Sequence, residues 1–536
     1  MKMVKSLLLG SAAGLVAVAG AQAADLPVKA KPVEYVKICS IYGAGFFYIP
    51  GTDSCIKIGG WVRAEYGFQT GNSAVEFNQG AQGRNNRIDT NEYAMRARWT
   101  TSIDVRTQTE YGTLRAYSRA GFQTTTGETT QGRIYTERGF IQFAGFTFGK
   151  SQSYFDFFGG AFCYGCSYTG AASMTGAAGT LLAAYTATFG NGFTATLSIE
   201  DNFMRRNGIW DAGTDALAIS ALPGNCAAQD SYNVAVVPCG DTAATGIPDI
   251  VGSLRVDQAW GSAQIAGALH QLRAGYYGNN TTGAALSAVG PGGFTGLAPN
   301  DAYGWAVMAG IVINLPWQKG DKFYVEATFA EGAGAYAGMD GGISGKNNTF
   351  GRFNGGNVAA AWAMDSVFAN MVGPTGSAVG ALGGSGQQLT RYFSITGAFE
   401  HYWTPALRTD FWASFTAADY NDQATAIFCS SPVGPVRTVA GATPNFATGA
   451  VLGCNPDWDI WAVGVRTIWN PAPQFDVGFE VFYTRLETKF EAPNAAAGRG
   501  VLLNFAGAGG RAVGNYVPSS ENVWGSILRL QRNFWP

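Results

Sequence analysis

The chain has 536 residues, with 35 basic and 37 acidic side chains and a formal charge of −2 at pH 7. This near balance argues against nucleic acid as a partner, because nucleic-acid binding favours a basic surface. Hydrophobic residues make up 47% of the chain, whereas charged residues make up 13%, about half their usual share. A chain of this length usually forms two or more soluble domains, but no shift in composition marks a linker between domains.

The first 23 residues have the pattern of a secretory signal peptide. Lys2 and Lys5 form a positive start, residues 6–19 are apolar, and Ala21-Gln22-Ala23 is a small-residue cleavage site. Loss of the two lysines with this peptide leaves a charge of about −4. The alternative, an uncleaved membrane anchor, is disfavoured because the apolar run is shorter than the ~20 residues of a membrane helix. No later stretch approaches that length.

Stretches that alternate apolar and polar residues follow the signal. In residues 92–106, Met95 and Trp99 point to one side of a strand and Arg96 and Arg98 to the other. The same period of two recurs over residues 56–66 and 475–483. This period is typical of a membrane barrel wall, with lipid outside and water inside, and also of a soluble β-sandwich.

Sixteen strands are predicted along the chain. Their ranges are 55–68, 91–105, 112–120, 133–143, 147–150, 181–189, 193–201, 250–258, 262–274, 302–315, 322–332, 391–402, 408–419, 457–469, 475–487 and 521–534. The fifth range is short for a membrane strand, so we expect the real strand to be longer. Residues 24–54, before the first strand, are interpreted as an N-terminal periplasmic segment, and residues 55–536 as the barrel.

The connections between these strands distinguish a barrel from a sandwich. Seven are short, at residues 106–111, 144–146, 190–192, 258–261, 316–321, 403–407 and 470–474. They alternate with eight long polar segments, at 69–90, 121–132, 151–180, 202–249, 275–301, 333–390, 420–456 and 488–520. Short periplasmic turns and long extracellular loops are typical of outer-membrane barrels. The sequence therefore predicts an all-β, sixteen-stranded antiparallel transmembrane barrel, wide enough for an aqueous channel.

Tryptophans recur at one end of the predicted strands. Trp260, Trp317, Trp403 and Trp469 lie at or beside four of the short connections. Trp prefers the level of the lipid headgroups, so this recurrence indicates an interfacial girdle.

Eight cysteines form four sequence-close pairs: Cys39/Cys55, Cys163/Cys166, Cys226/Cys239 and Cys429/Cys454. An even number in an exported chain favours disulfides, although eight cysteines allow 105 connectivities. Closing a loop of about fifteen residues would contribute on the order of 3 kcal/mol. Cys163-Tyr-Gly-Cys166 also fits a redox or zinc motif, but no second CxxC or nearby His accompanies it. A local bridge is therefore favoured, and no metal or cofactor is predicted.

Several motifs resemble the alphaproteobacterial general porins. They are the segment from Cys39 to Cys55 with the following IKIGGWVR, ADLPVKAKP at 24–32, TQTEYGTLRAY at 107–117 and GFTFGKSQSYFDF at 145–157. The resemblance implies a trimeric diffusion channel in the outer membrane, with the third loop folded inward. Its partners would be lipid, lipopolysaccharide, and small hydrophilic solutes and ions. In that family the last strand usually ends on an aromatic residue, whereas here Trp535 and Pro536 follow Phe534.

Basic residues on the lumen side of the early strands are predicted to line the pore constriction. They are Lys57, Arg63, Arg96, Arg98, Arg115, Arg119 and Arg138. Arginine is costly on the lipid face, which favours the lumen, and fixed charge in a channel focuses the field. Alternatively, some lie at the rim, bind lipopolysaccharide phosphates, or pair with Glu65, Asp104 and Glu110.

The third long segment, 151–180, contains one acidic residue, Asp156, and an aromatic run, Tyr154, Phe155, Phe157 and Phe158. We expect the aromatics to pack the segment against the inner wall. Asp156 is either the acidic side of the constriction or a cap near Lys150. One carboxylate against several arginines predicts weak selectivity for anions.

The sequence leaves three alternative functions. A barrel hydrolase needs a Ser/His pair, but only His270 and His401 exist, both on predicted strands. A substrate-specific channel is the nearer alternative, although Trp61 and Tyr117 are few aromatics for a dedicated binding path. A structural or adhesive barrel with cysteine-stapled loops is the third alternative.

Overall fold

A computed structural model describes residues 37–73, 90–126, 132–157, 162–165, 173, 175, 179–212, 242–243, 245–275, 298–339, 349–369, 385–431, 434–444, 449–505 and 514–534. The predictions for the signal peptide, Phe158, Cys166, Cys226, Cys239, Trp535 and Pro536 lie outside these residues. Within the described part, no helix has both the length and the apolar character needed to cross a membrane.

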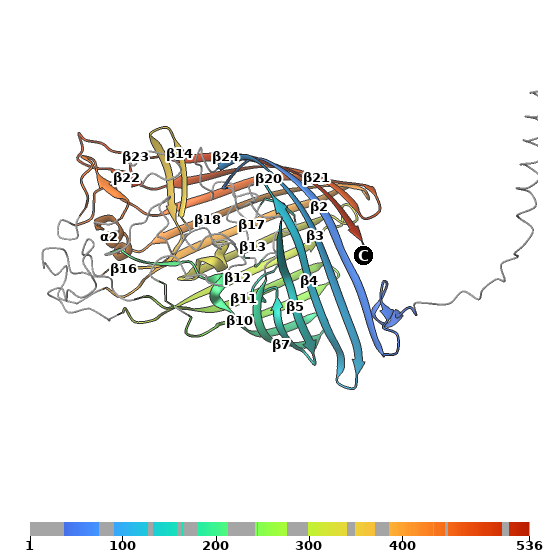
Figure 1. The fold of residues 1–536 in the computed structure, drawn as a ribbon. Coiled ribbons are helices and arrows are strands. Elements are labelled where there is room, and N and C mark those ends of the chain that lie inside the picture. The colour runs from blue at the N-terminus through green and yellow to red at the C-terminus, as the bar shows by residue number, and fades with distance from the viewer. Residues whose placement is uncertain are drawn as a thin grey trace, which may run out of the picture.

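Sixteen antiparallel strands close into a barrel (Figure 1). They are β2 (Ser54–Ser73), β3 (Thr90–Thr109), β4 (Gly112–Thr125), β5 (Arg133–Phe143), β6 (Phe146–Ser151), β7 (Thr180–Gly190), β8 (Phe193–Glu200), β10 (Asp249–Gln258), β11 (Gly261–Leu272), β12 (Ala302–Asn314), β13 (Lys322–Glu331), β17 (Gln388–Thr404), β18 (Leu407–Tyr420), β20 (Trp458–Ala472), β21 (Phe475–Thr488) and β24 (Glu521–Phe534). Consecutive members pair, and β24 returns to pair with β2, Leu530 opposite Ala64. The predicted barrel and its sixteen strands are confirmed. The fifth strand, β6, has 6 residues and is longer than its predicted range 147–150, as expected.

The seven short connections lie together at one end of the barrel, called the short-turn end, on the right in Figure 1. Ala144 and Gly145 have φ of 49° and 85°, and Asn191 and Gly192 have φ of 49° and 79°. Two consecutive positive φ values are typical of type I′ turns, whose twist matches that of the strands. The girdle residues Trp260, Trp317, Trp403 and Trp469 are all exposed at this end.

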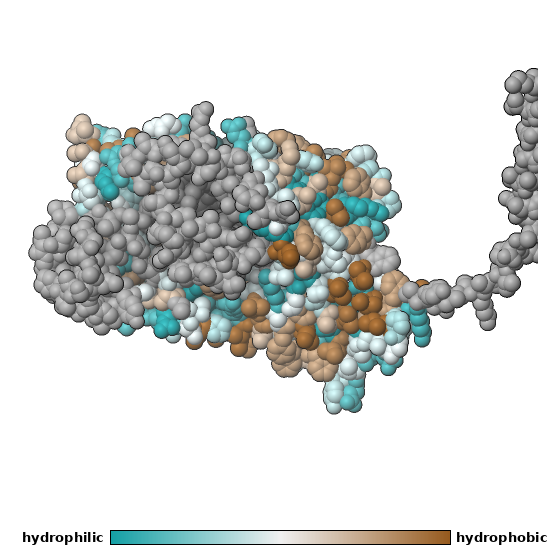
Figure 2. Space-filling view, viewed as in Figure 1, coloured by the Kyte–Doolittle hydropathy of each residue, from teal (hydrophilic) through white to brown (hydrophobic). Residues whose placement is uncertain are grey.

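The alternation of side chains separates an apolar outside from a polar inside. Trp99, Ile265 and Phe479 are exposed on the outer face, whereas Gln264 and Glu480 are buried on the inner face. Figure 2 shows apolar side chains over the outer surface of the short-turn half. The period of two therefore has the predicted meaning, with an apolar face for lipid and a polar face for the lumen.

The other end, called the long-loop end, carries additional structure. β9 (Gly208–Asp211) pairs in parallel with β16 (Met364–Phe368), which also pairs with β17. A separate sheet runs in the order β14 (Thr349–Asn354), β15 (Asn357–Trp362), β23 (Gly514–Pro518), β22 (Val501–Phe505) and β19 (Val436–Thr438). The short helices η4 (Asn202–Arg205), η5 (Gly334–Ala337) and α2 (Asp422–Ser430) complete this end.

The N-terminal segment lies at the short-turn end (Figure 1). It contains η1 (Ser40–Tyr42) and β1 (Phe47–Tyr48), which pairs with the start of β2. The disulfide between Cys39 and Cys55 closes this segment onto the barrel, as predicted.

Candidate functional site

Arginines of β2 to β5 form three like-charged pairs across neighbouring strands. Arg63 lies directly opposite Arg98, Arg106 opposite Arg115, and Arg119 opposite Arg138. Like charges in such positions destabilise a sheet unless other groups compensate. The guanidinium carbon of Arg63 lies 4.0 Å from the ring centroid of Trp61, and those of Arg98 and Arg119 lie 5.8 Å from it. The buried indole of Trp61 is therefore surrounded by three positive charges.

Of the three arginines around Trp61, Arg98 has the fewest polar contacts with described residues. Its guanidinium lies 4.6 Å from the ring centroid of Tyr135. Its Nε atom is buried, with no hydrogen-bond acceptor among the described residues. Since guanidinium groups bind carboxylates and phosphates through paired N–H groups, Arg98 is suited to bind an anion in the lumen.

The other basic residues are neutralised to different degrees. Glu65 binds Arg96 at 2.7 Å and Arg529 at 2.6 Å, and Asp104 binds Arg115 at 2.9 Å. The remaining four predicted residues have these contacts. Arg63 donates to Gln531 at 2.7 Å and lies 3.9 Å from Glu65, and Arg119 binds Glu137 at 2.7 Å. Arg138 donates to the carbonyl of Glu137 at 2.7 Å, and Lys57 donates to the carbonyl of Ala44 in the N-terminal segment at 3.3 Å. The alternative of pairing with Glu65 and Asp104 thus holds for Arg96 and Arg115.

The segment after β6, called loop 3, contacts inward-facing side chains of distant strands. Gln264 on β11 donates to the carbonyls of Tyr154, Phe155 and Asp156 at 3.2–3.3 Å. Three buried glutamates of the wall accept backbone N–H groups from loop 3. They are Glu200 from Tyr154 at 3.0 Å, Glu326 from Ser173 at 2.9 Å, and Glu480 from Tyr164 and Gly165, both at 2.8 Å. We call these three residues the anchoring glutamates.

Two glycines of the wall leave space for aromatic side chains of loop 3. A Cβ atom on Gly310 of β12 would lie 2.5 Å from the ring of Phe157, and one on Gly478 of β21 would lie 2.0 Å from the Tyr164 hydroxyl. Tyr164 also contacts two guanidinium groups, with that of Arg529 3.6 Å from its ring centroid and that of Arg466 4.9 Å away. Aromatic residues of loop 3 therefore do pack against the inner wall.

Asp156 is buried, at 5% exposure, and has its own set of partners. It forms an ion pair with Arg205 of η4 and accepts hydrogen bonds from the Thr175 hydroxyl at 2.7 Å and the Ser173 hydroxyl at 3.4 Å. Lys150, considered as its neighbour, instead donates to the carbonyl of Thr136 at 2.9 Å. The charge of Asp156 is thus compensated where it lies.

Sequence reasoning missed the residues that hold loop 3. Arg205, Arg466 and Arg529 contact it, as do the anchoring glutamates. Lumen parity on the later strands could have found Arg466, Arg529, Glu326 and Glu480. Nothing in the sequence could have paired Arg205 with Asp156, because η4 lies in a long loop whose path has no period.

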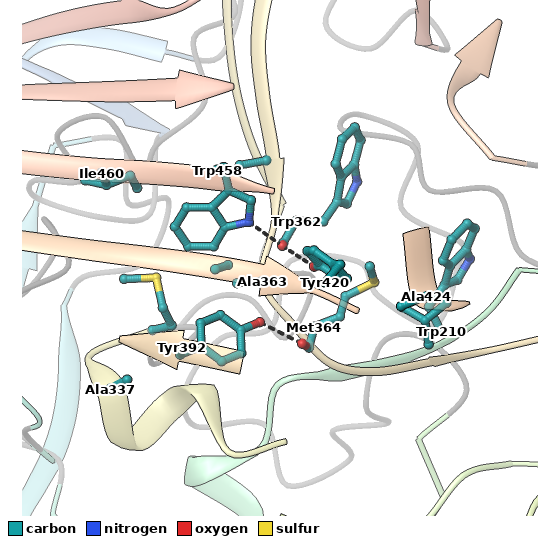
Figure 3. Packing of buried hydrophobic residues seen from close by; sticks show 14 of the residues in the cluster. Trp210, Ala337, Trp362, Ala363, Met364, Tyr392, Tyr420, Ala424, Trp458 and Ile460 are labelled. Carbon is teal, nitrogen blue, oxygen red and sulfur yellow. Dashed lines mark hydrogen bonds between the residues drawn. The ribbon is translucent and has the colours of Figure 1, made fainter. Parts of the chain in front are cut away.

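An apolar core lies inside the lumen at the long-loop end (Figure 3). Residues 334–339 and 357–369, which we call the mouth plug, contribute the fully buried Tyr336 and Trp362. Inward-facing aromatics of the wall donate hydrogen bonds to plug carbonyls. Tyr392 donates to Met364 at 2.6 Å, and Tyr420 and Trp458 donate to Trp362 at 2.5 and 2.7 Å. The plug is therefore fixed by its backbone as well as by apolar packing.

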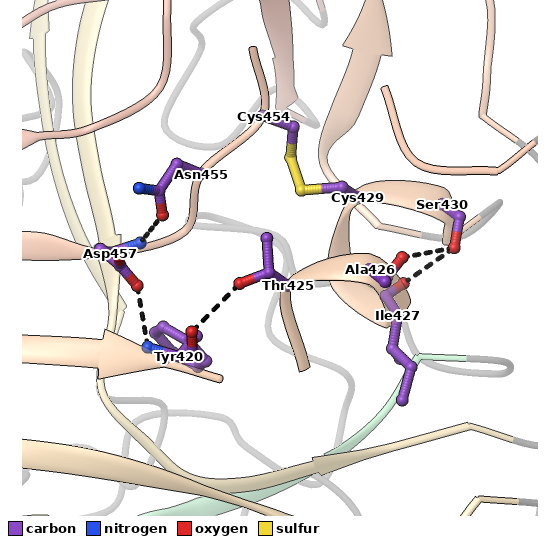
Figure 4. The surroundings of a disulfide bond; sticks show 9 residues. All are labelled: Tyr420, Thr425, Ala426, Ile427, Cys429, Ser430, Cys454, Asn455 and Asp457. Carbon is purple, nitrogen blue, oxygen red and sulfur yellow. Dashed lines mark hydrogen bonds between the residues drawn. A yellow bond between two sulfur atoms is a disulfide. The ribbon is translucent and has the colours of Figure 1, made fainter. Parts of the chain in front are cut away.

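A disulfide between Cys429 and Cys454 fastens α2 next to this core (Figure 4). The helix begins after Asn421, whose side chain accepts the N–H of Ala424 at 2.8 Å as an N-cap. This second sequence-close cysteine pair is confirmed. Cys163 is disulfide-bonded as well.

Both histidines are paired with aspartates. His270 Nδ1 lies 2.8 Å from Asp249, and His401 Nδ1 lies 2.8 Å from Asp321. His270 is buried near the mouth plug, whereas the His401 side chain is 26% exposed at the short-turn end.

Comparisons with known proteins agree with this architecture. A profile of the family described as "Porin subfamily" matches residues 25–504. Porin Omp2b of Brucella suis is 33% identical over 271 residues, covering 48% of this chain and 64% of that protein, and porin Omp2b of Brucella melitensis matches to the same extent. The match thus spans less than two thirds of these relatives. The outer membrane channel DcaP of Acinetobacter baumannii is similar in fold, with a TM-score of 0.53 at 11% identity, over 91% of this chain and 99% of that one. This chain belongs to the porin subfamily, and its barrel is a bacterial outer-membrane barrel.

Proposed function

We propose that the protein forms a water-filled channel for passive diffusion of small hydrophilic solutes and ions across the outer membrane. The closed sixteen-stranded wall with a polar inner face carries this proposal, because a barrel of this size leaves an aqueous lumen. Loop 3 narrows the lumen, and the arginines of β2 to β5 select by charge. The resemblance to porins further supports a signal peptide at residues 1–23, contact with lipid and lipopolysaccharide, and a homotrimer rather than an enzyme.

The like-charged arginine pairs support a preference for anions. Lys57, Arg63, Arg96, Arg98, Arg115, Arg119 and Arg138 are the proposed basic side of the constriction. Asp156 is the acidic residue of loop 3, and Arg205 compensates its charge. The potential around Trp61 is therefore positive, which raises the local concentration of anions.

Planar-bilayer recording tests both parts of the proposal. The purified protein should give conductance steps in groups of three, and a salt gradient should give a reversal potential that leans toward anions. Arg63→Gln with Arg98→Gln should shift this potential toward cations. Arg485→Gln, at the long-loop end and paired with Glu487, is the matched control and should leave it unchanged. Absence of conductance would contradict the channel, and strong cation preference of the wild type would contradict the charge selection.

A substrate-specific anion channel is the second candidate. The Nε of Arg98, which has no hydrogen-bond partner among the described residues, lies beside Trp61 and Tyr135 and favours this candidate. A fixed guanidinium can hold one carboxylate or phosphate at a time. Saturable block of the current by one such solute, and not by others of similar size, would distinguish it from the general porin.

A further inference from the structure

His270 is enclosed by acidic groups from the wall and from the mouth plug. Its Nδ1 lies 2.8 and 3.0 Å from the two carboxylate oxygens of Asp249, the first residue of β10. Its Nε2 lies 3.9 Å from a carboxylate oxygen of Asp365, in the mouth plug. All three side chains are at most 1% exposed. One imidazole thus lies between a carboxylate of the wall and a carboxylate of the plug.

Both carboxylates have further partners that join the plug to its surroundings. Tyr336 of η5 donates its hydroxyl to Asp249 at 2.6 Å. Asp365 accepts the N–H of Gly334 at 2.7 Å and that of Asn207 at 2.8 Å. Asp365 lies where the register between β16 and β9 shifts, as at a β-bulge. Bulges are often used to direct a particular side chain.

The remaining charged groups around this cluster are Glu200 at the end of β8, Asp201 just after it, Arg205 at the end of η4 and Arg206 just after it. Arg206 acts electrostatically on His270, Asp365 and Asp249, and Arg205 and Glu200 act on Tyr336. Burial raises the pKa of the Asp365 carboxyl, and the positive charge of His270 is the main group that opposes this effect. With His270 protonated, two cations, His270 and Arg206, face Asp249 and Asp365, and Arg206 also faces Asp201. The positive charge of His270 therefore offsets one of these carboxylates.

We propose that His270 is a pH-sensitive latch that holds the mouth plug against the barrel wall while its imidazole is protonated. In the protonated form Nδ1–H donates to Asp249 and Nε2–H faces Asp365. When the imidazole releases its Nε2 proton to solvent, a lone pair faces the Asp365 carboxylate and the cluster gains one uncompensated negative charge. The attraction between wall and plug is then lost, and the plug separates from the wall more readily.

The latch is connected to loop 3 through Arg205. This guanidinium pairs with Asp156, donates to the Ser173 hydroxyl at 3.0 Å and to the Ala335 carbonyl of η5 at 3.3 Å. Phe155 of loop 3 also packs on Tyr336, with ring centroids 4.7 Å apart. Release of the latch therefore loosens the contact between η5 and loop 3, and both obstructions of the lumen respond.

The sign of the pH effect follows from the proton that the closed state retains. In the open state Asp249 stays beside His270 on the wall but Asp365 has moved away, so the open state holds the Nε2 proton less tightly than the closed state. Where opening releases this proton, the closed-to-open ratio falls up to about tenfold per pH unit. We therefore expect conductance and the fraction of time spent open to rise from pH 6 to pH 9.

The test is recording of the wild type, His270→Gln and His401→Gln across this pH range. Recording of the current rests on the proposed channel function. Hydrogen exchange of the amides of residues 358–369 therefore provides a second measurement, which does not depend on conductance. Exchange is compared between proteins at each pH, which cancels its intrinsic pH dependence. His270→Gln should be open and fast-exchanging at every pH, up to about tenfold faster than wild type at pH 6.

His401→Gln is the matched control, because His401 is the only other histidine, also pairs with an aspartate and lies at the opposite end of the barrel. It should keep the wild-type response to pH. Equal plug exchange in wild type and His270→Gln at pH 6 would overturn the proposal, as would loss of the response in His401→Gln. Should His270→Gln fail to fold, a wild type whose conductance does not change between pH 6 and pH 9 would overturn it equally.

Discussion

The two halves of the barrel wall use inward-facing charge in different ways. On β2 to β5 the arginines outnumber their acidic partners, and three pairs of them lie directly opposite one another. On β8, β13 and β21 the anchoring glutamates are at most 1% exposed, and each accepts a backbone N–H group of loop 3. Charge of the first kind acts on passing solutes, whereas charge of the second kind acts on the protein itself.

This contrast has a physical reason. A loop that crosses the lumen must satisfy its backbone donors away from bulk water, and a carboxylate accepts several of them at once. Arginine has no acceptor and cannot replace glutamate in this role. One wall therefore holds the loop, and the other wall is left with uncompensated positive charge.

Replacing Glu480 should have the largest effect on how the wall holds loop 3. Glu480 accepts the N–H groups of Tyr164 and Gly165 and the Nε1–H of Trp412, each at 2.8 Å. Glu480→Ala leaves three buried donors without an acceptor, at a cost of about 3 kcal/mol or more. We expect loop 3 to detach, the single-channel conductance to rise and the unfolding midpoint in urea to fall.

Glu487→Ala is the control for that change, on the same strand. Glu487 pairs with Arg485 near the surface at 2.6 Å, with both side chains 33% exposed. Such a pair contributes about 0–1 kcal/mol, so conductance and stability should stay close to wild type. Equal losses in the two variants would show that Glu480 stabilises the strand and has no special relation to the loop.

Replacing a glycine on a strand that carries an anchoring glutamate should have a smaller effect on conductance. Gly478→Ala places a methyl group 2.0 Å from the Tyr164 hydroxyl, and overpacking of this kind costs about 1–3 kcal/mol. Tyr164 must move away from Arg529 and Arg466, which raises the conductance. Gly252→Ala on β10 is the control, because a Cβ there would meet no heavy atom of the described residues within 4 Å. A conductance of Gly478→Ala equal to that of Gly252→Ala would contradict the seating of Tyr164.

The wall was predictable from the sequence, and the contacts inside it were not. The period of two and the alternation of short and long connections predicted the sixteen strands, because each strand has one face in lipid and one in the lumen. Glu326 and Glu480 follow the same period as the arginines, so nothing local separates an anchor from a pore-lining charge. Their role depends on the path of loop 3. That path depends on glycines of the wall, such as Gly310, that leave space for aromatic side chains of the loop. The ion pair between Asp156 and Arg205 was not predicted for the same reason.

Asp457 provides the smallest and most specific test, since it accepts a backbone N–H and forms no ion pair within the part of the chain that the structure describes. Its carboxylate accepts the N–H of Tyr420 at 2.8 Å. Burial raises its pKa, helped by the nearby Asp419 and Asp459. An acid whose pKa is raised by folding destabilises the folded state once it ionises, so its stability contribution is lost as the pH rises.

Asp457→Asn keeps the acceptor oxygen and removes this charge. The unfolding midpoint at pH 7 should therefore rise, and the difference should disappear below about pH 3.9, the ordinary pKa of aspartate. Asp422→Asn gives the opposite sign as a control, because Asp422 lies in the first turn of α2, where negative charge is favourable. A lower midpoint for Asp457→Asn at pH 7 would mean that the N–H of Tyr420 needs a full negative charge. The anchoring glutamates would then owe their effect to charge as much as to their position.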